Sequence, residues 1–468
     1  MNETVTIVGA GLAGSLMAIF LARRGYSVTL LEKRPDMRLE SLPAGRSINL
    51  ALANRGLKPL RAVGLEDRVR EQLVTMRGRM VHDEQGRTQL QPYGQHPWEV
   101  IYSISRPGLN ALLLDEAQAA GVELRFCKAC SRVDLDDGVL AFADEDDGQT
   151  IELPLRRCIA ADGAGSVLRE ALMKRTDFDH SVEWLEHSYK ELCIPARGDG
   201  GYRIDPNALH IWPRGGYMLI ALPNLDGSFT VTLFLPNGGD PGFDSLDTSG
   251  RVRGFFHDQF PDAAALIPDL EDAFFDNPTG PLGTVRSAPW HLGDKLCLLG
   301  DAAHAVVPFH GQGMNAAFED CLEMDACLGA TGGDWARTFE LFFERRKPNA
   351  DAIADMAIEN YGDAGIGGRP AIPAAQATGV RAGTSSAGPP RAAVLDGDVS
   401  RRHRLRGRPI PRPHATGDHG TRLGGQGAAG GDRHRRRGAG SAGDAAAHLT
   451  QNLGITTKQG DNLCRPRR

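Results

Sequence analysis

The sequence predicts an α/β protein in which a first domain, built on a βαβ unit, is interrupted by a second domain with an antiparallel sheet. Three observations predict this architecture. The chain opens with a strand, a glycine-rich turn, a helix and a second strand. Between residues 190 and 235 short apolar runs alternate with Pro and Gly, and near residue 295 a buried strand and long helices return. A βαβ unit heads a parallel sheet, whereas short runs split by turn residues are typical of antiparallel strands.

Hydrophobic periodicity and turn residues place each element. The first part should contain strands at residues 4–8 and 27–31, a glycine turn at 9–14, a helix at 15–24, a helix at 109–120, and strands at 122–126 and 157–160. The inserted part should contain strands at 209–212, 217–222 and 228–235. The last part should contain a strand at 295–299 and helices at 313–328 and 335–361.

These elements predict four regions. Residues 1–175 form the first part of a nucleotide-binding domain, with embedded segments at about 70–105 that are expected to contact the substrate. Residues 176–285 form the antiparallel-sheet domain, and residues 286–361 complete the first domain. Residues 362–468 form a tail.

The tail differs in composition from the rest of the chain. It contains no Phe, Trp, Tyr, Met or Glu, and it holds 17 Arg and one Lys against seven Asp. Such a segment cannot bury enough apolar surface to offset the entropy lost on ordering. Two explanations stay open: a disordered basic tail that binds nucleic acid, or a reading frame shifted relative to an ancestral one.

The charge balance argues against nucleic-acid binding by the main body. The chain carries −6 and its tail +11, so residues 1–361 carry −17, whereas duplex recognition needs a positive surface. Scattered cysteines and the lack of a secretory signal predict a cytoplasmic protein. The lack of an apolar run of roughly 18 residues predicts no membrane segment. We expect no metal, because the pair Cys127 and Cys130 has no second pair.

Residues 9–14 read GAGLAG between a predicted strand and helix, which is the context of the dinucleotide fingerprint. Gly9 permits the tight turn, Gly11 lets the backbone approach the diphosphate, and Gly14 lets helix and strand pack closely. The helix N-terminus favours the negative diphosphate. Glu32 ends the second strand, where its carboxylate can accept from both ribose hydroxyls. An acid there disfavours a 2′-phosphate, so the pattern predicts FAD or NAD.

Two later motifs favour FAD. Asp301 directly follows the predicted strand at 295–299, where an acid can hold the hydroxyls of a ribityl chain. The sequence GQGMN at 311–315 opens a helix whose backbone N–H groups can face the pyrimidine edge of a flavin. Reduced flavin carries negative charge at that edge, so the helix dipole stabilises it.

The order of these motifs, with Asp162-Gly163 between them, resembles the single-component FAD-dependent aromatic hydroxylases over residues 4 to about 361. Within that group the chain is similar to the kynurenine 3-monooxygenases. The segments that carry this likeness are GRSINLAL at 45–52, MRGRM at 76–80, QPYG at 91–94, LHIWP at 209–213, IALPN at 220–224 and PFHGQGMN at 308–315.

The resemblance implies a role for specific residues. Cofactor-binding positions of the family match Ala13, Leu31, Glu32, Lys33, Arg34, Ala51, Arg106, Asp301, Gly313, Met314 and Asn315, beside the three glycines of the fingerprint. Substrate positions match Arg79, Tyr93 and Asn360. Arg79 and Tyr93 would bind the substrate carboxylate, because a guanidinium forms a bidentate pair with it and a phenol adds one donor.

The resemblance also implies a reaction. L-Kynurenine would be hydroxylated to 3-hydroxykynurenine by NADPH and O₂ through a flavin C4a-hydroperoxide, in tryptophan degradation toward NAD. The flavin does the chemistry, so no side chain needs to be a catalytic residue, and His304 and His310 more commonly have a packing role. A single fingerprint indicates that NADPH binds only transiently.

The chain departs from the family after Asn360. Family members supply a further substrate-contacting tyrosine there, but this sequence has none after Tyr361. Two alternatives therefore stay open: hydroxylation of another aromatic acid, or flavin binding with impaired hydroxylation.

Overall fold

The computed structural model describes residues 3–39, 49–144 and 148–363. The segment at 45–52 is therefore described only from Asn49 onward, and residues 364–468 of the predicted tail lie outside the described residues.

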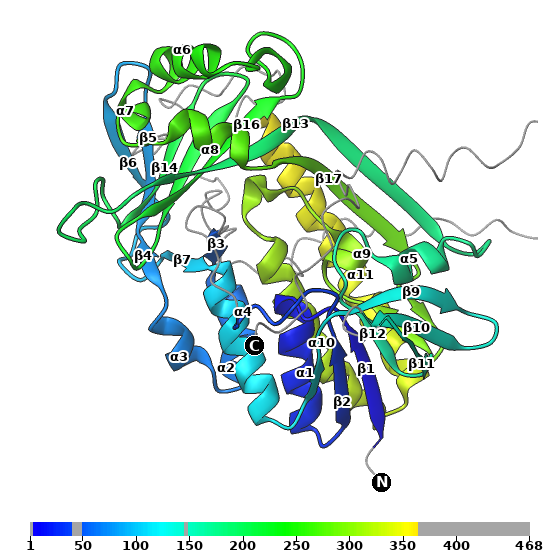
Figure 1. The fold of residues 1–468 in the computed structure, drawn as a ribbon. Coiled ribbons are helices and arrows are strands. Elements are labelled where there is room, and N and C mark those ends of the chain that lie inside the picture. The colour runs from blue at the N-terminus through cyan, green and yellow to red at the C-terminus, as the bar shows by residue number, and fades with distance from the viewer. Residues whose placement is uncertain (1–2, 40–48, 145–147, 364–468) are drawn as a thin grey trace, which may run out of the picture. The chain divides into compact units, whose positions relative to one another are not determined.

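The first layer is a six-stranded sheet with the order β18-β19-β12-β1-β2-β8. Neighbouring strands pair in parallel, except that β18 is antiparallel to β19. The strands are β1 (Thr4–Val8), β2 (Ser27–Leu31), β8 (Glu123–Arg125), β12 (Cys158–Ala160), β18 (His291–Leu292) and β19 (Leu296–Leu298). The chain leaves this sheet after β12 and returns at β18, so the expected interruption is confirmed (Figure 1). The exact domain limits stay a prediction.

Two helices of this layer begin three residues earlier than expected. Helix α1 (Leu12–Arg23) starts directly after Gly11, which is its N-cap. Helix α4 (Arg106–Ala119) starts at Arg106 because the side chain of Ser105 accepts a hydrogen bond from the amide of Gly108. Pro107 lies in the first turn, where a missing N–H costs nothing.

The second layer is a seven-stranded sheet with the order β17-β13-β16-β15-β14-β5-β6. It is antiparallel except that β5 pairs in parallel with β14. Strands β5 and β6 come from the embedded segment near 70–105 and add to the edge of this sheet. The strands are β5 (Gly78–His82), β6 (Thr88–Pro92), β13 (Asp179–Ile194), β14 (Ala208–Pro213), β15 (Met218–Pro223), β16 (Phe229–Pro236) and β17 (Thr279–Ala288). The sequence reading missed β13 and β17, since many of their residues are exposed and interrupt the apolar pattern.

Each layer has its own hydrophobic core. The first core lies between the six-stranded sheet and the helices that cover it, and includes Leu16, Ile159 and Phe318. The second core lies between one face of the seven-stranded sheet and three helices, α6 (Ser249–Gln259), α7 (Pro261–Ala264) and α8 (Leu270–Asp276). Figure 1 shows these helices over that sheet. The opposite face of the sheet is therefore left to face the first layer.

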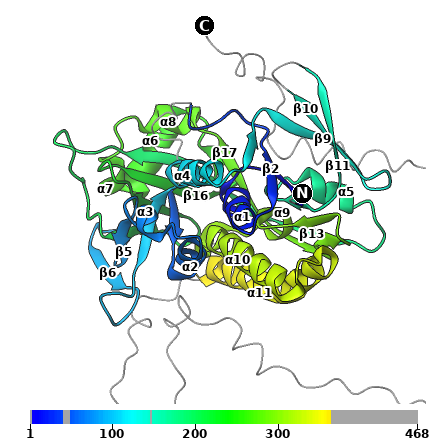
Figure 2. The same cartoon turned by 90° about the horizontal axis from the view of Figure 1, so that it is seen from below.

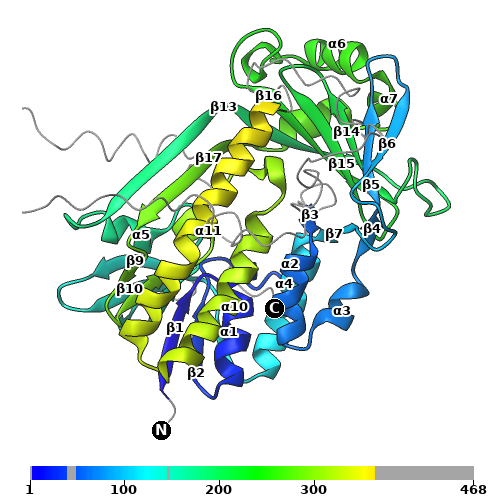
Figure 3. The ribbon, with the colours of Figure 1, turned by 180° about the vertical axis from the view of Figure 1, so that it is seen from behind.

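Helices α10 (Gly313–Thr331) and α11 (Trp335–Asp363) run side by side along the first layer (Figures 2 and 3). Near its start, α11 buries Trp335 and Phe339 in the first core. Near its end, Ala357 packs with Phe234 of the seven-stranded sheet. One helix thus touches both layers.

The remaining elements are short. They are β3 (Asn49–Leu52), α2 (Asn54–Ala62), α3 (Glu66–Arg70), β4 (Val74–Met76), β7 (Ile101–Ser105), β9 (Lys128–Asp134), β10 (Val139–Asp144), β11 (Thr150–Pro154), α5 (Val167–Leu172), η1 (Phe243–Ser245), α9 (Asp301–His304) and η2 (Pro308–His310). They include two three-stranded sheets, β3-β7-β4 and β11-β10-β9. No helix within residues 3–39, 49–144 and 148–363 is long and apolar enough to cross a membrane.

The second core should be sensitive to truncation of a buried side chain. Leu233 of β16 is fully buried, so Leu233→Ala should lower the free energy of unfolding by about 2–5 kcal/mol. Leu225, in the turn between β15 and β16, is 59% exposed, and Leu225→Ala should change it by no more than about 0.5 kcal/mol. Urea denaturation of both variants checks this, and equal effects would contradict the packing.

Candidate active site

The glycine turn after β1 has the geometry that each glycine was predicted to supply. Gly9 has a φ of +101°, and a Cβ there would collide with the carbonyl of Ala161. A Cβ on Gly14 would collide with the carbonyl oxygen of Gly9, so α1 and the turn pack as closely as a backbone allows. A Cβ on Gly11 would meet no atom of the described chain within 4 Å. Open space therefore lies in front of the N-terminus of α1.

Glu32 holds this turn as well as facing the site. Its Oε2 accepts a hydrogen bond from the amide of Ala10 at 2.9 Å, and its Oε1 accepts from the amide (3.0 Å) and the Nε (2.8 Å) of Arg34. Burial alone would raise the pKa of Glu32, but the bonds from Arg34 and Ala10 outweigh it and lower the pKa. Glu32 is therefore a charged acceptor. The sequence reading assigned it only to a ribose.

The second predicted motif meets the first. Gly300, with a φ of +60°, ends the stretch after β19, and Asp301 is the exposed first residue of α9. A Cβ on Gly300 would lie 3.2 Å from the Cβ of Ala317 and 3.4 Å from that of Ala13. The fold thus places Asp301 beside the start of α1, although nearly 300 residues separate them.

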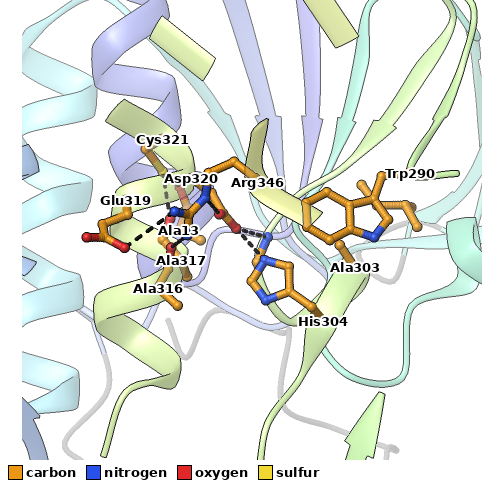
Figure 4. A network of polar contacts seen from close by, with 12 residues as sticks. Ala13, Trp290, Ala303, His304, Ala316, Ala317, Glu319, Asp320, Cys321 and Arg346 are labelled. Atoms are coloured by element: carbon orange, nitrogen blue, oxygen red, sulfur yellow. Dashed lines mark hydrogen bonds and ion pairs between the residues drawn. The ribbon is translucent and has the colours of Figure 1, made fainter. Parts of the chain in front are cut away.

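A fully buried carboxylate, Asp320 of α10, fixes this second turn (Figure 4). Its Oδ2 accepts from the amide of Gly300 at 3.1 Å and from Nε2 of His304 at 2.6 Å. Its Oδ1 accepts from Nε of Arg346, on α11, at 2.7 Å. Arg346 also donates to the carbonyl of Ala316 at 3.2 Å. Three segments therefore converge on one carboxylate.

The interactions around Asp320 favour its charged form. Burial alone would raise its pKa, but the interactions with His304 and Arg346 outweigh burial and lower it. The ring of His304 lies 4.9 Å from that of Trp290. Because His304 is buried and bonded to Asp320, its place is structural. This agrees with the packing role that was expected for it.

The N-terminus of α10 is fixed by Asn315. Its Oδ1 accepts from the amide of Ala53 at 3.0 Å, and its Nδ2 donates to the carbonyls of Ala51 (2.9 Å) and Gly311 (3.1 Å). The side-chain amide is thus occupied by the backbone, and only the N–H of Asn315 is left for a flavin. Gly313 and Met314 open the same helix and are half-buried.

These features fit FAD. The open space before α1 suits a diphosphate, Glu32 suits a ribose, Asp301 suits a ribityl chain, and the start of α10 suits a pyrimidine edge. Leu31 is buried behind Glu32, while Lys33 and Arg34 are exposed at its side. Arg106 is exposed at the start of α4, and its charge acts on Glu191 and Tyr189 of the seven-stranded sheet. It therefore lies between the layers.

The face of the seven-stranded sheet that turns toward the first layer contains two of the three predicted substrate residues, Arg79 and Tyr93. Arg79 lies on β5, with its guanidinium 5.9 Å from the ring centre of Tyr93. Nε of Arg79 and the hydroxyl of Tyr93 are buried, and neither has a hydrogen-bond partner among the described residues. Burial raises the pKa of Tyr93 to about 12, against the charge of Arg79 and the close approach of the Arg79 side chain. Tyr93 and Ala51 pack against the same apolar cluster, so the predicted substrate and cofactor residues come together at this wall.

Asn360, the third predicted substrate residue, lies near the end of α11 and not on the seven-stranded sheet. Its Nδ2 donates to the carbonyl of Phe309 in η2, so the structure uses it to hold α11 against the stretch before α10. His310 follows in the same turn and is half-buried; burial and the charges of Arg79 and Arg55 lower its pKa. His310 is therefore neutral near pH 7 and close to Arg79.

Two side chains on this wall had no predicted role. Asn49 donates to Oγ of Ser103 (3.1 Å) and to the carbonyl of Pro223 (3.0 Å). Its buried Oδ1 has no partner in the part of the chain that the structure describes. Burial raises the pKa of Glu191 to about 7, against the charge of Arg106. Asn49 lies in the segment at 45–52 that resembles the family, but the sequence predicted no role for it. Glu191 lies on β13, a strand that the sequence analysis did not predict.

Comparison with known proteins agrees with this geometry. The family described as "FAD binding domain" matches residues 2–194 and 268–356. A kynurenine 3-monooxygenase of Myxococcus xanthus is 53% identical over 361 residues, which cover 77% of this chain and 78% of the relative. Kynurenine 3-monooxygenases of Xanthomonas campestris (50% over 359 residues; 77% and 78%) and Stenotrophomonas maltophilia (49% over 360 residues; 77% and 79%) are similar as well.

Solved structures share the fold at lower identity. 2-Methyl-3-hydroxypyridine-5-carboxylic acid oxygenase superimposes with a TM-score of 0.64 at 19% identity, over 78% of this chain and 93% of that chain. PqsL of Pseudomonas aeruginosa superimposes with a TM-score of 0.62 at 19% identity, over 79% and 99%.

Replacement by alanine should have different effects at Gly14, which is closely packed, and at Gly11, which faces open space. Gly14→Ala forces a Cβ into the carbonyl of Gly9, so the melting temperature of the FAD-free protein should fall. Gly11→Ala meets open space, so that temperature should stay the same while FAD affinity drops by about tenfold or more, because the added methyl enters the diphosphate space. Thermal melting and FAD titration check both; a destabilised Gly11→Ala apoprotein would contradict the open space.

Removing the carboxylate of Asp320 should destabilise the protein strongly. Asp320→Ala leaves Arg346 and His304 buried without their acceptor, which should cost about 3–5 kcal/mol and weaken FAD retention. The exposed pair of Arg337 and Glu340 is the control, and Arg337→Ala should cost about 0–1 kcal/mol.

The same pair of Asp320 and Arg346 predicts a pH dependence. Because the pKa of Asp320 is lowered in the folded state, its contribution to stability is complete above its unfolded-state pKa of about 4 and is lost as the pH falls below it. The stability of wild type and Asp320→Ala should therefore converge in acid. A constant difference down to acidic pH would contradict this assignment.

Proposed function

Because the chain belongs to the kynurenine 3-monooxygenase family of FAD-binding proteins, we propose that it hydroxylates L-kynurenine to 3-hydroxykynurenine with NADPH and O₂. The observation that carries this proposal is the pair of buried donors, Nε of Arg79 and the hydroxyl of Tyr93. Neither has a partner within the described ranges, and both lie on the wall that meets Ala51 of the cofactor side.

Buried donors without partners cost free energy unless a ligand satisfies them. An α-amino-acid carboxylate supplies the acceptors, since a guanidinium and a phenol can both donate to it. The raised pKa of Tyr93, about 12, keeps its phenol protonated and able to donate. An aromatic substrate without a carboxylate would leave both groups unsatisfied.

Apolar side chains near these donors would hold the ring of the substrate. Ile101, Leu209, Ile220 and Leu222 pack around Tyr93, and Phe309 packs against Phe234 at a ring distance of 5.1 Å. FAD supplies the redox and oxygen-transfer chemistry when bound. The chain binds the carboxylate, orients the ring and excludes water from the reacting carbon.

Two further features bear on the proposal. The cysteines form no disulfide among residues 3–39, 49–144 and 148–363, which supports a reducing compartment such as the cytoplasm. A second candidate function, FAD binding without coupled hydroxylation, is favoured by the extent of the match. The alignment covers 78% of the Myxococcus xanthus relative, so part of that relative has no counterpart in it.

The role of Arg79 can be tested with a substrate pair. Arg79→Gln should raise the KM for L-kynurenine by about 10–100-fold, because a charge-assisted hydrogen bond contributes roughly 1.5–3 kcal/mol. The decarboxylated analogue of kynurenine should have the same KM in wild type and variant. Arg77→Gln is the matched control, since Arg77 is exposed two residues away. Equal KM changes for both substrates, or no change, would contradict carboxylate binding by Arg79.

A further inference from the structure

The back of strand β5 contains a buried histidine. Successive side chains of a strand point to opposite faces, so Arg79 points toward the first layer and His82, three residues later, points into the second core. His82 is 4% exposed. Its ring stacks on that of Trp212 at 4.0 Å with a 25° tilt.

A chain of hydrogen bonds runs through His82. Its Nδ1 lies 2.8 Å from Oδ2 of Asp262, and its Nε2 lies 2.8 Å from Nδ1 of His210. Nε2 of His210 lies 2.8 Å from the carbonyl oxygen of Asp205. The Nε1 of Trp212 donates to the same oxygen of Asp262 at 2.8 Å. The chain joins β5, β14 and α7.

The groups at the two ends of this series of hydrogen bonds determine which ring nitrogens donate. A carbonyl oxygen only accepts, so Nε2 of His210 donates to Asp205. Burial lowers the pKa of His210 to about 4, so this ring is neutral near pH 7 and its Nδ1 accepts. Nε2 of His82 must therefore donate to His210.

At the other end of the series, Asp262 requires that Nδ1 of His82 donates as well. Burial alone would raise the pKa of Asp262, but the hydrogen bonds from His82 and Trp212 lower it to about 2. The carboxylate is therefore charged and accepts from Nδ1 of His82. His82 is thus hydrogen-bonded at both ring nitrogens, beside the carboxylate of Asp262 and stacked on Trp212.

This histidine holds a hairpin at the edge of the sheet. Strands β5 and β6 form the edge of the sheet, and β6 is largely exposed. The hairpin comes from a distant part of the chain, and β5 joins the sheet by pairing in parallel with β14. The carbonyl of His82 also accepts from Nη1 of Arg214 at 3.2 Å. The charged groups around His82 are Asp262 of α7, Arg214 after β14, and Asp83 and Glu84 of its own turn.

We propose that His82, through its hydrogen bonds to Asp262 and His210, is a positioning residue that fixes β5 and thereby aims Arg79 at the carboxylate of the substrate. The identity of that substrate rests on the function proposed above. A small displacement of the guanidinium weakens binding of a carboxylate that needs two aligned hydrogen bonds. His82 touches neither FAD nor substrate, so the effect acts on KM.

The kinetic test compares His82→Gln with His187→Gln in the FAD-loaded enzyme. His187 is a buried histidine on β13 of the same sheet, far from Arg79 in strand order. We expect His82→Gln to raise the KM for L-kynurenine by about tenfold or more, with the flavin absorption spectrum unchanged, and to leave the KM for the decarboxylated analogue unchanged. His187→Gln should change neither KM even where it lowers the melting temperature. An unchanged KM in His82→Gln, or equal shifts for both substrates, would overturn the proposal.

A second measurement does not depend on turnover. In ¹⁵N-histidine-labelled holoenzyme, His82→Gln should shift the ring signals of His210, because the two rings share a hydrogen bond, and Asp262→Asn should shift those of His82. Unchanged His210 signals in His82→Gln would overturn the proposal even if kynurenine is hydroxylated. Shifted signals in a protein that does not hydroxylate kynurenine would instead overturn the proposed function and leave the network standing.

Discussion

The buried carboxylate of Asp320 is the constraint on which the arrangement of the site depends. It fixes the Gly300 turn from α10, and it pairs with Arg346 so that α11 lies along α10. A buried charge is tolerated only when it is paired and hydrogen-bonded, and this one has three donors. Because α11 reaches both layers, the same pair also relates the cofactor side to the sheet that contains Arg79. Asn360 adds a second attachment of α11 near its end.

The proposed substrate-binding side differs from the Asp320 site, because its buried polar groups lack partners within the described residues. Its donors, Arg79 and Tyr93, are held on an edge hairpin and left without partners among the described residues, so the free energy of satisfying them is available to a ligand. On the other face of the same strand, His82 has every donor satisfied. Strand β5 thus has a histidine that is hydrogen-bonded at both ring nitrogens on one face, and the proposed carboxylate-binding Arg79 on the other. In the proposed function, such a pair selects against molecules that lack the carboxylate.

Much of the fold could be predicted from the sequence, because it depends on local patterns. The glycine turn, β1 and β2 were placed correctly, and Gly9, Gly11 and Gly14 have the surroundings that their predicted roles require. What could not be predicted depends on contacts between distant residues. Strand β13 has an exposed first half without an apolar period, so Glu191 was missed with it. The bonds of Asp320 and His82 join residues far apart in the chain, and no local pattern marks them. The flavin and substrate contacts of the predicted residues remain predictions.

The most direct test of the central claim follows NADPH oxidation by the FAD-loaded protein with and without L-kynurenine, and quantifies 3-hydroxykynurenine and hydrogen peroxide in the same reaction. The account predicts that L-kynurenine accelerates NADPH oxidation and that hydroxylated product exceeds peroxide, because the buried donors and the apolar wall hold the ring and exclude water. Oxidation that yields peroxide alone, or no response to L-kynurenine, would contradict the hydroxylase function while leaving the FAD-binding fold in place.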